Sequence, residues 1–208
     1  MKPIIDYSIY LITDHNYLRG RNFLSCIEDA LRGGVTLVQL REKDVDGGLF
    51  LQRACAVKTL CDKYKVPLLI NDRIDIALAC KAAGVHLGQA DIPLNVARGI
   101  LGSDAIIGVS AHSLEEARAA ERDGADYLGV GAVFPTNSKN NASEVGVNML
   151  KEILKMSKLP IIGIGGINAQ NLAQVRAAGA QGAAIISGIL SADNIEEEVR
   201  KIKMTISD

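Results

Sequence analysis

Two aspartates stand just beyond short apolar runs of the kind that form buried strands. Asp72 follows Pro67 to Ile70 and Asn71, and Asp91 comes shortly after Val85 to Leu87. As a pair, the two carboxylates suit Mg²⁺, which takes one or two carboxylates and fills its shell with water and phosphate oxygens. Either aspartate alone would serve as a helix N-cap, because each precedes a helical pattern. We predict a metal site in which Asp72 and Asp91 hold one Mg²⁺.

Basic side chains stand near these carboxylates. Strand alternation over Thr36 to Arg41 places Gln39 and Arg41 on one face together with Lys43, and Lys139 lies in a long loop after a later strand. A buried guanidinium needs an anionic partner. The alternative for such charges is a solvated rim. Cations beside a magnesium site predict a polyanionic substrate, namely a diphosphate with a second phosphate.

Two glycine-containing turns near the end of the chain match a phosphate site. Ile164 to Asn168 contains Gly165-Gly166, and Ile186-Ser187-Gly188 precedes a helical segment. Glycine lets backbone N–H groups approach phosphate closely, and barrels build such sites after their seventh and eighth strands. The alternative for the first turn is a tight turn in which Asn168 caps the next helix.

The sequence lacks the usual patterns of a nucleophile or a histidine metal site. His15, His86 and His112 have no metal-ligand spacing, and no cysteine stands at a predicted strand end. We interpret His86 as a hydrogen-bonded structural residue, while His112 lies close enough to Ser110 to reach the rim of the site. No Gly-x-x-x-x-Gly-Lys-[Ser/Thr] motif occurs, which argues against a P-loop NTPase.

Alternating strands and helices must position these groups. The predicted strands are Ile9 to Thr13, Thr36 to Arg41, Pro67 to Ile70, Val85 to Leu87, Ile106 to Ser110, Tyr127 to Val130, Pro160 to Ile164 and Ala183 to Ser187. The predicted helices are Arg21 to Leu31, Gly47 to Tyr64, Ile74 to Ala82, Leu94 to Leu101, Leu114 to Asp123, Gly146 to Met156, Ala169 to Ala177 and Ile195 to Met204. Eight strand–helix units without a linker predict an α/β fold: a single (β/α)8 TIM barrel over residues 1–208, with its active site at the carboxyl ends of the strands. An open doubly wound sheet is the main alternative.

Glycines on three strands predict open volume inside the barrel. By alternation, Gly108 shares a face with Ser110, Gly129 with Gly131, and Gly163 with Gly165. A barrel built only for stability fills its interior with Val, Ile and Leu. We therefore expect these glycines to face inward and leave room for a ligand.

Composition excludes several classes of protein. The chain has 208 residues and a net charge of −1, so no basic field is available to hold nucleic acid. No run reaches the ~18 apolar residues of a membrane span, and the N-terminus lacks the apolar region of a signal peptide. Cys26, Cys55, Cys61 and Cys80 are expected to be free, buried thiols. We expect a cytoplasmic protein with no membrane partner, and a homo-oligomer is compatible with the sequence.

Seven segments together resemble the thiamine phosphate synthase family and span nearly the whole chain. They are Tyr10-Leu11-Ile12-Thr13-Asp14, Gln39-Leu40-Arg41-Glu42-Lys43, Leu69-Ile70-Asn71-Asp72-Arg73, Gly84 to Asp91, Gly108-Val109-Ser110, Gly129 to Thr136 and Gly165-Gly166-Ile167. The resemblance implies a Mg²⁺-dependent (β/α)8 barrel that joins 4-amino-2-methyl-5-pyrimidinylmethyl diphosphate to a thiazole phosphate or its carboxylate and releases pyrophosphate.

The resemblance also implies roles for individual residues. The pyrimidine diphosphate would contact Gln39, Arg41, Lys43, Asn71, Ser110 and Lys139, and the motif extends this substrate-binding set to Leu40 and Glu42. The thiazole phosphate would be held by Thr136, Asn137, Ser138, Gly166, Ile186 and Ser187. The metal ligands would be Asp72 and Asp91. The family commonly shows Thr-x-Thr-Lys in the sixth loop, where this chain has Thr136-Asn137-Ser138-Lys139, and the serine keeps the hydroxyl.

The expected reaction is dissociative. Pyrophosphate leaves first, while Arg41, Lys43, Ser110 and Lys139 stabilise its charge, and the thiazole nitrogen then attacks the carbon. Two alternatives stay open: a related thiazole phosphate tautomerase, which carries a histidine near the position of Ala132, and a non-catalytic sensor of phosphate ligands.

Overall fold

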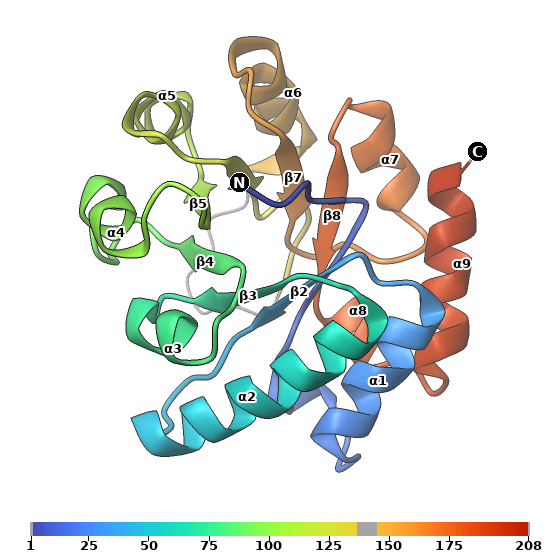
Figure 1. The fold of residues 1–208 in the computed structure, drawn as a ribbon. Coiled ribbons are helices and arrows are strands. Elements are labelled where there is room, and N and C mark those ends of the chain that lie inside the picture. The colour runs from blue at the N-terminus through green and yellow to red at the C-terminus, as the bar shows by residue number, and fades with distance from the viewer. Residues whose placement is uncertain (1, 137–144, 208) are drawn as a thin grey trace.

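A closed barrel of parallel strands forms the centre of the computed structural model, which describes residues 2–136 and 145–207 (Figure 1). Its strands are β1 (Ile9–Ile12), β2 (Leu37–Leu40), β3 (Leu68–Asn71), β4 (Gly84–Leu87), β5 (Ile106–Ala111), β6 (Tyr127–Val130), β7 (Ile161–Ile164) and β8 (Gly182–Ile185). Each strand pairs with the next in the sequence, and β8 pairs with β1. The predicted (β/α)8 barrel is confirmed, and the open sheet is excluded.

Helices surround the strands in a ring (Figure 1). They are η1 (His15–Tyr17), α1 (Phe23–Gly33), α2 (Gly47–Tyr64), α3 (Ile74–Ala79), α4 (Leu94–Leu101), α5 (Leu114–Asp123), α6 (Gly146–Met156), α7 (Leu172–Ala177), α8 (Ser187–Leu190) and α9 (Ile195–Ser207). The chain reverses after α1 and α5 at Gly34 and Gly124, whose φ angles of 111° and 96° favour glycine. The predicted bounds of α2, α4, α5 and α6 are confirmed.

Helices α1, α3 and α9 end two or three residues away from their predicted ends, and two further differences lie near the strand ends that face the site. Helix α7 begins at Leu172 rather than Ala169, because Asn171 accepts a bond from the Asn168 amide and donates to the Gly166 carbonyl, which stabilises a turn there. Strand β8 ends at Ile185, and Ser187 begins the short helix α8 instead of ending the strand. Side chain–backbone bonds of this kind compete with regular structure.

Apolar side chains form two layers, one on each side of the strands. The outer layer packs the strands against the helices and includes Val38, Leu40 and Leu128. The inner layer fills the barrel and comprises Tyr10, Ile12, Leu37, Leu69, Ile106, Tyr127, Ile162 and Ala184. Alternation along each strand therefore separates the helix-facing residues from those inside the barrel.

The inner layer corrects the expectation for the interior glycines. On β7, Ile162 faces inward and Gly163 faces outward, where an added Cβ would lie 2.6 Å from Cγ1 of Val175 on α7. Gly108 faces inward, but the Tyr127 ring occupies its space, and an added Cβ would lie 2.0 Å from Cζ of that ring. Of these glycines, Gly129 on β6, Gly131 just beyond it and Gly165 at the end of β7 line a cavity.

The outward position of Gly163 gives a test of packing. Gly163→Ala would force its methyl group into Val175, and overpacking of this kind typically lowers the free energy of unfolding by about 1–3 kcal/mol. Gly99→Ala is the matched control, because a Cβ at this position in α4 meets nothing within 4 Å and should stabilise the helix by about 0.5–1 kcal/mol. Urea denaturation of both variants measures the difference, and equal stabilities would refute this packing.

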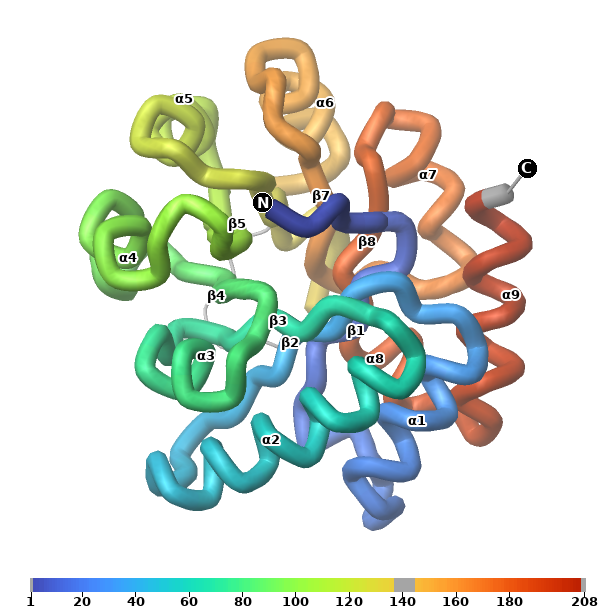
Figure 2. The backbone as a smooth tube through the Cα atoms, viewed as in Figure 1, coloured from blue at the N-terminus to red at the C-terminus, as the bar shows by residue number. Residues whose placement is uncertain are grey.

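The segment before β1 crosses the end of the barrel where the strands begin (Figure 2). Its Lys2 pairs with Asp126, and its Tyr7 ring lies 4.9 Å from the Tyr127 ring, measured between centroids. This segment covers the amino end of the barrel, so a ligand would enter at the opposite end.

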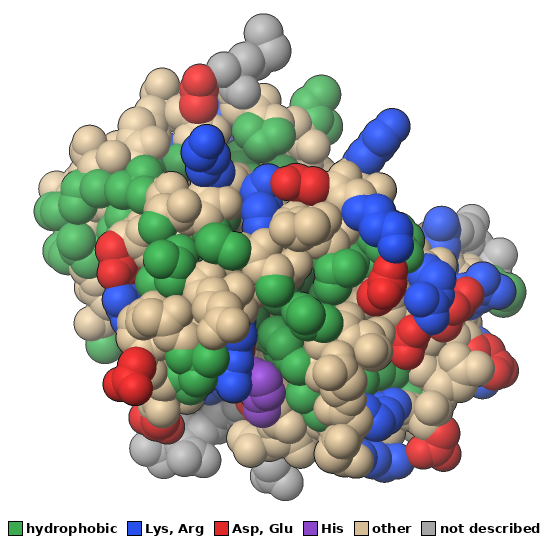
Figure 3. All heavy atoms as spheres, turned by 60° about the horizontal axis from the view of Figure 1, so that its bottom comes forward, with side chains coloured by type: hydrophobic (Ala, Val, Ile, Leu, Met, Phe, Trp, Pro, Cys, Tyr) green, Lys and Arg blue, Asp and Glu red, His purple; other side chains and the backbone are tan. Residues whose placement is uncertain are grey.

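The outer surface carries both signs of charge. Figure 3 shows basic and acidic side chains intermixed on one face of the molecule. Across the structure, side chains of opposite charge form ion pairs such as Arg32–Glu196 and Lys63–Glu28. Within residues 2–136 and 145–207, no helix has the length and apolar character to cross a membrane.

The cysteines are free, as expected, but they are not all buried. Cys26, Cys61 and Cys80 are buried, whereas Cys55 is exposed on α2, so the expectation was wrong for that residue. Burial raises the pKa of the Cys61 thiol to about 12, which keeps it protonated at neutral pH.

Candidate active site

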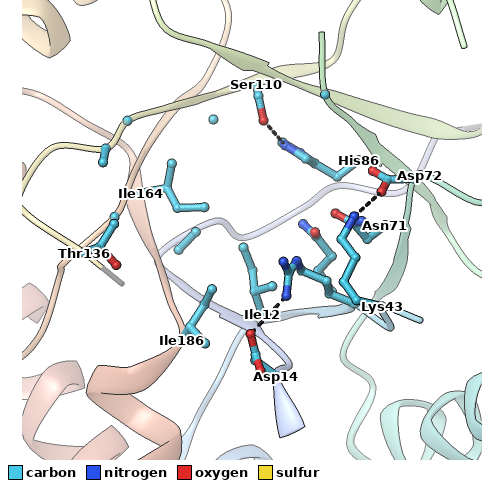
Figure 4. Close-up of a pocket in the computed structure, with 18 of the residues that line it drawn as sticks. Ile12, Asp14, Lys43, Asn71, Asp72, His86, Ser110, Thr136, Ile164 and Ile186 are labelled. Atoms are coloured by element: carbon cyan, nitrogen blue, oxygen red, sulfur yellow. Dashed lines mark hydrogen bonds and ion pairs between the residues drawn. The ribbon is translucent and has the colours of Figure 1, made fainter. Parts of the chain in front are cut away.

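A cavity of about 750 Å³ opens at the carboxyl ends of the strands (Figure 4). Its walls hold most of the residues that the sequence singled out: Gln39, Arg41, Lys43, Asn71, Asp72, Asp91, Ser110, Thr136, Gly166, Ile186 and Ser187. Asn137, Ser138 and Lys139, the other predicted site residues of the sixth loop, lie outside the described residues. Together with Ile12 and Asp14 at the end of β1, the cavity therefore gathers residues from all eight strand ends.

Two of the predicted substrate-binding side chains point away from the cavity. Leu40 is buried in the outer layer between β2 and the helices. The Glu42 carboxylate is also buried, and it accepts bonds from Arg53 at 2.6 Å and from the His15 ring at 2.9 Å. The five-residue motif thus sends only Gln39, Arg41 and Lys43 into the cavity, because alternate residues face opposite sides.

Neither predicted metal-binding aspartate caps a helix. The N-cap residues of α3 and α4 are Arg73 and Pro93. Asp72 instead accepts from Lys43, with 3.1 Å between Nζ and Oδ2, and Figure 4 shows both side chains on one side of the cavity. Asp91 accepts from the Gly88 amide at 2.6 Å. The helix-cap alternative is therefore wrong, and both carboxylates are available to the cavity.

The Asp91 carboxylate lies close enough to Asp72 to be affected by it. Partial burial raises the pKa of Asp91, and the neighbouring Asp72 carboxylate raises it further. A cation between two such groups would relieve their repulsion, and carboxylate oxygens are the ligands that Mg²⁺ prefers. In the described part of the chain, no third histidine, cysteine or acidic residue joins the pair as a metal cluster. Two carboxylates are within the number that Mg²⁺ usually takes from a protein.

Arg41 has an anionic partner within the protein. Its Nη1 donates to Oδ2 of Asp14 at 3.0 Å, and Asp14 is buried just after β1. The expectation that this guanidinium needs an anionic partner is thus met by Asp14. Asp14 also accepts from the Asn16 amide, which holds the carboxylate in place. Sequence reasoning missed this role of Asp14, although its position directly after a strand end was the available signal.

His86 and Ser110 lie together on the wall of the cavity (Figure 4). His86 Nε2 is 2.9 Å from Ser110 Oγ, and its Nδ1 is 2.8 Å from the Tyr127 hydroxyl. This confirms the prediction of a hydrogen-bonded His86, which also lines the cavity. His112 lies at the rim, with its Nδ1 2.9 Å from the Glu116 carboxylate.

Gly165-Gly166 allows the sixth loop to approach the end of β7. An added Cβ on Gly166 would lie 2.5 Å from the Pro135 carbonyl oxygen, and φ is +65° at this glycine. The Phe134 amide donates to the Gly165 carbonyl at 3.1 Å. The tight turn of the alternative is present, but Asn168 does not cap α7, whose N-cap residue is Asn171, so the predicted cap is wrong.

The cavity has a polar side and an apolar side. In Figure 4, Lys43, Asn71 and Asp72 lie on one side, and Ile164 and Ile186 lie on the other with Thr136 at their edge. A ligand with a charged group and an uncharged ring would match this division.

Comparisons with known proteins identify relatives along almost the entire length. Residues 9–189 match the family model described as thiamine monophosphate synthase. A thiamine-phosphate synthase of Clostridium acetobutylicum is 53% identical over 196 residues, which cover 94% of this chain and 93% of that protein. Another, from Ruminiclostridium cellulolyticum, is 49% identical over 202 residues, which cover 97% of this chain and 96% of that protein.

A solved structure shares both sequence and architecture. The thiamine phosphate pyrophosphorylase from Pyrococcus furiosus is 35% identical and superposes with a TM-score of 0.90. The match covers 97% of this chain and 96% of the chain of that protein.

Proposed function

The chain belongs to the thiamine monophosphate synthase family, and on that premise we propose how its cavity carries out the transfer. Its similarity to these relatives identifies it as an enzyme that transfers a pyrimidinylmethyl group. The proposed reaction joins 4-amino-2-methyl-5-pyrimidinylmethyl diphosphate to a thiazole phosphate, forms thiamine phosphate and releases pyrophosphate. The observation that carries this proposal is the convergence of Arg41, Lys43, Asp72 and Asp91 on one cavity.

The polar side of the cavity would bind the diphosphate. Arg41 and Lys43 offer cations from β2 and the loop beyond it, and each is already held by a carboxylate, Asp14 and Asp72 respectively. We assign Asp72 and Asp91 as the residues that hold Mg²⁺. When bound, Mg²⁺ would neutralise charge on the phosphate oxygens of the leaving group.

The proposed chemistry requires charge stabilisation more than proton transfer. The bond between the methylene carbon and the diphosphate oxygen breaks, and its electron pair leaves with the diphosphate. The 4-amino group of the pyrimidine donates electrons to the ring and stabilises the cation. The thiazole nitrogen then uses its lone pair to form the new bond to carbon and has no proton to lose. Arg41, Lys43, Ser110 and Lys139 stabilise the departing charge.

The apolar side of the cavity would hold the thiazole ring. Ile164 and Ile186 provide apolar surface, and Thr136, Gly166 and Ser187 line the same cavity and would hold the thiazole phosphate. Placing the ring here aligns its nitrogen with the carbon under attack, which makes the second step effectively unimolecular. Asn137 and Ser138 remain predicted members of this phosphate site.

The tautomerase alternative is less consistent with the cavity. That activity was expected to show a histidine near position 132, and here Ala132 lines the cavity. It would also have little use for two carboxylates beside Arg41 and Lys43. The sensor alternative differs from the synthase only in turnover, so an assay must separate the two.

The test is pyrophosphate release by the purified protein. We expect release only when both substrates and Mg²⁺ are present, loss of release with a chelator, and recovery when Mg²⁺ is added in excess. Conversion of a thiazole phosphate tautomer without pyrophosphate would favour the tautomerase. Binding of both substrates without any product would favour the sensor, and unchanged turnover with the chelator would refute the metal assignment.

A further inference from the structure

Five side chains form a continuous chain of hydrogen bonds across the barrel interior. Gln39 Nε2 donates to the Tyr10 hydroxyl at 2.5 Å, and the Tyr10 and Tyr127 hydroxyl oxygens are 2.8 Å apart. Tyr127 continues to His86 Nδ1 at 2.8 Å, and His86 Nε2 continues to Ser110 Oγ at 2.9 Å. The hydrogen bonds therefore connect Gln39 and Ser110, which line the cavity, through the buried Tyr10 and Tyr127 and through His86, which also lines it.

Two glycines provide the space for this chain. Gly108 lies between His86 and Tyr127 in the register of β4, β5 and β6, and an added Cβ would come within 2.4 Å of the Tyr127 hydroxyl oxygen. Gly129 pairs with Ser110, and a Cβ there would lie 3.0 Å from Cε1 of the His86 ring. Tyr127 can thus reach over β5 to the imidazole only because position 108 has no side chain.

The two phenols each have one proton to donate. Both rings are almost completely buried, and burial raises the pKa of Tyr10 and of Tyr127 well above the ordinary tyrosine value. They therefore stay neutral at physiological pH. Among the described residues, no buried side-chain nitrogen or oxygen lacks a hydrogen-bond partner.

The Gln39 side-chain amide determines which partner donates in each of these hydrogen bonds. Gln39 Nε2 is a donor only, so the Tyr10 oxygen accepts from it. The buried Tyr10 proton also needs an acceptor, and the Tyr127 oxygen is the other partner of this hydroxyl among the described residues, so the proton goes to Tyr127. The Tyr127 proton then goes to His86 Nδ1, which must be unprotonated to accept it. A neutral imidazole consequently carries its proton on Nε2 and donates it to Ser110 Oγ. Because Ser110 Oγ accepts in this bond, its own hydroxyl proton is not used in it and can be donated to another group.

We propose that Gln39, Tyr10, Tyr127 and His86 form an ordered relay that aims the Ser110 hydroxyl proton into the cavity, with Tyr127 and His86 as positioning residues. This rests on the proposed function, in which Ser110 stabilises the departing diphosphate. With the opposite order, Ser110 would donate to His86 and present oxygen lone pairs to an anion. The relay thus makes Ser110 a donor where negative charge develops.

The first test reads the order directly and needs no substrate. The ¹⁵N spectrum of the free protein, with the three histidines assigned through single variants, distinguishes a protonated ring nitrogen from a bare one. We expect His86 to be protonated at Nε2 and unprotonated at Nδ1. A proton on Nδ1 with a bare Nε2, or protons on both nitrogens, would overturn the proposed order whether or not the enzyme makes thiamine phosphate.

The second test asks whether the order serves the reaction. Tyr127→Phe keeps the ring but removes the link to His86, so we expect kcat to fall about 10-fold, with KM for the pyrimidine diphosphate changing less than about twofold. In a Ser110→Ala background, the same substitution should have no further effect on kcat, because the relay acts through Ser110. Tyr7→Phe is the matched control. It removes the hydroxyl from a ring that packs on Tyr127 and leaves the relay intact.

The outcomes separate positioning from structure. An equal loss of kcat from Tyr127→Phe in both backgrounds, or no loss in either, would overturn the positioning role. Circular dichroism verifies that the variants fold, and if Tyr127→Phe does not, Tyr10→Phe breaks the same relay one link earlier and is expected to give the same pattern.

Discussion

Replacing Asp72 with asparagine is expected to lower kcat about 10²–10³-fold while leaving the fold intact. The substitution removes one of the two carboxylates assigned to Mg²⁺ and the anionic partner of Lys43. Asparagine is the appropriate replacement because φ at this position is +62°, a left-handed conformation that asparagine tolerates better than alanine does. Steady-state pyrophosphate release at saturating Mg²⁺ measures the effect.

Asp75→Asn is the matched control for this variant. Asp75 lies three residues further along the chain, is exposed and pairs with Arg73, so the same loss of charge there should change kcat by less than about twofold. Equal rates for the Asp72 and Asp75 variants would contradict the metal assignment.

Replacing Arg41 with methionine is expected to reduce kcat/KM for the pyrimidine diphosphate by about 10²–10³-fold, because the guanidinium would no longer stabilise the leaving group. The same substitution should also destabilise the protein. It leaves the Asp14 carboxylate, which is only 6% exposed, without its ion-pair partner. Thermal unfolding and steady-state kinetics measure the two effects separately.

The double variant Arg41→Met with Asp14→Asn separates these two roles. Removing the orphaned charge should recover most of the lost stability, but turnover should stay as low as in the single variant. If turnover also returned, Arg41 would serve to neutralise Asp14 rather than to bind the diphosphate.

The architecture was predictable because helix and strand periods repeat along the whole chain. Helices such as α4 and α5 have amphipathic patterns and clear ends, and their bounds agree with the sequence. The inward or outward direction of β7 was not predictable, because Gly163 fits either face and only the packing of α7 against it decides. Glycine gives no pattern of its own, so alternation alone assigned it wrongly.

Much of the candidate site was also predictable, because polar residues at strand ends must meet at one end of a parallel barrel. Asp72, Asp91 and Arg41 all line the cavity for this reason. Sequence reasoning missed the Arg41–Asp14 pair and the Tyr10–Tyr127 link, since both depend on which strands become neighbours and in what register. Tyrosines on apolar strands are typical of core residues, and nothing local reveals their hydrogen bonds.

The most direct test of the account is a crystal structure of the protein with Mg²⁺ and pyrophosphate. We expect a metal ion bound by Asp72 and Asp91, with the pyrophosphate bound to that ion and in contact with Arg41 and Lys43. Pyrophosphate bound elsewhere, or a cavity that stays empty at saturating concentrations of both, would contradict the claim that this end of the barrel receives a departing diphosphate.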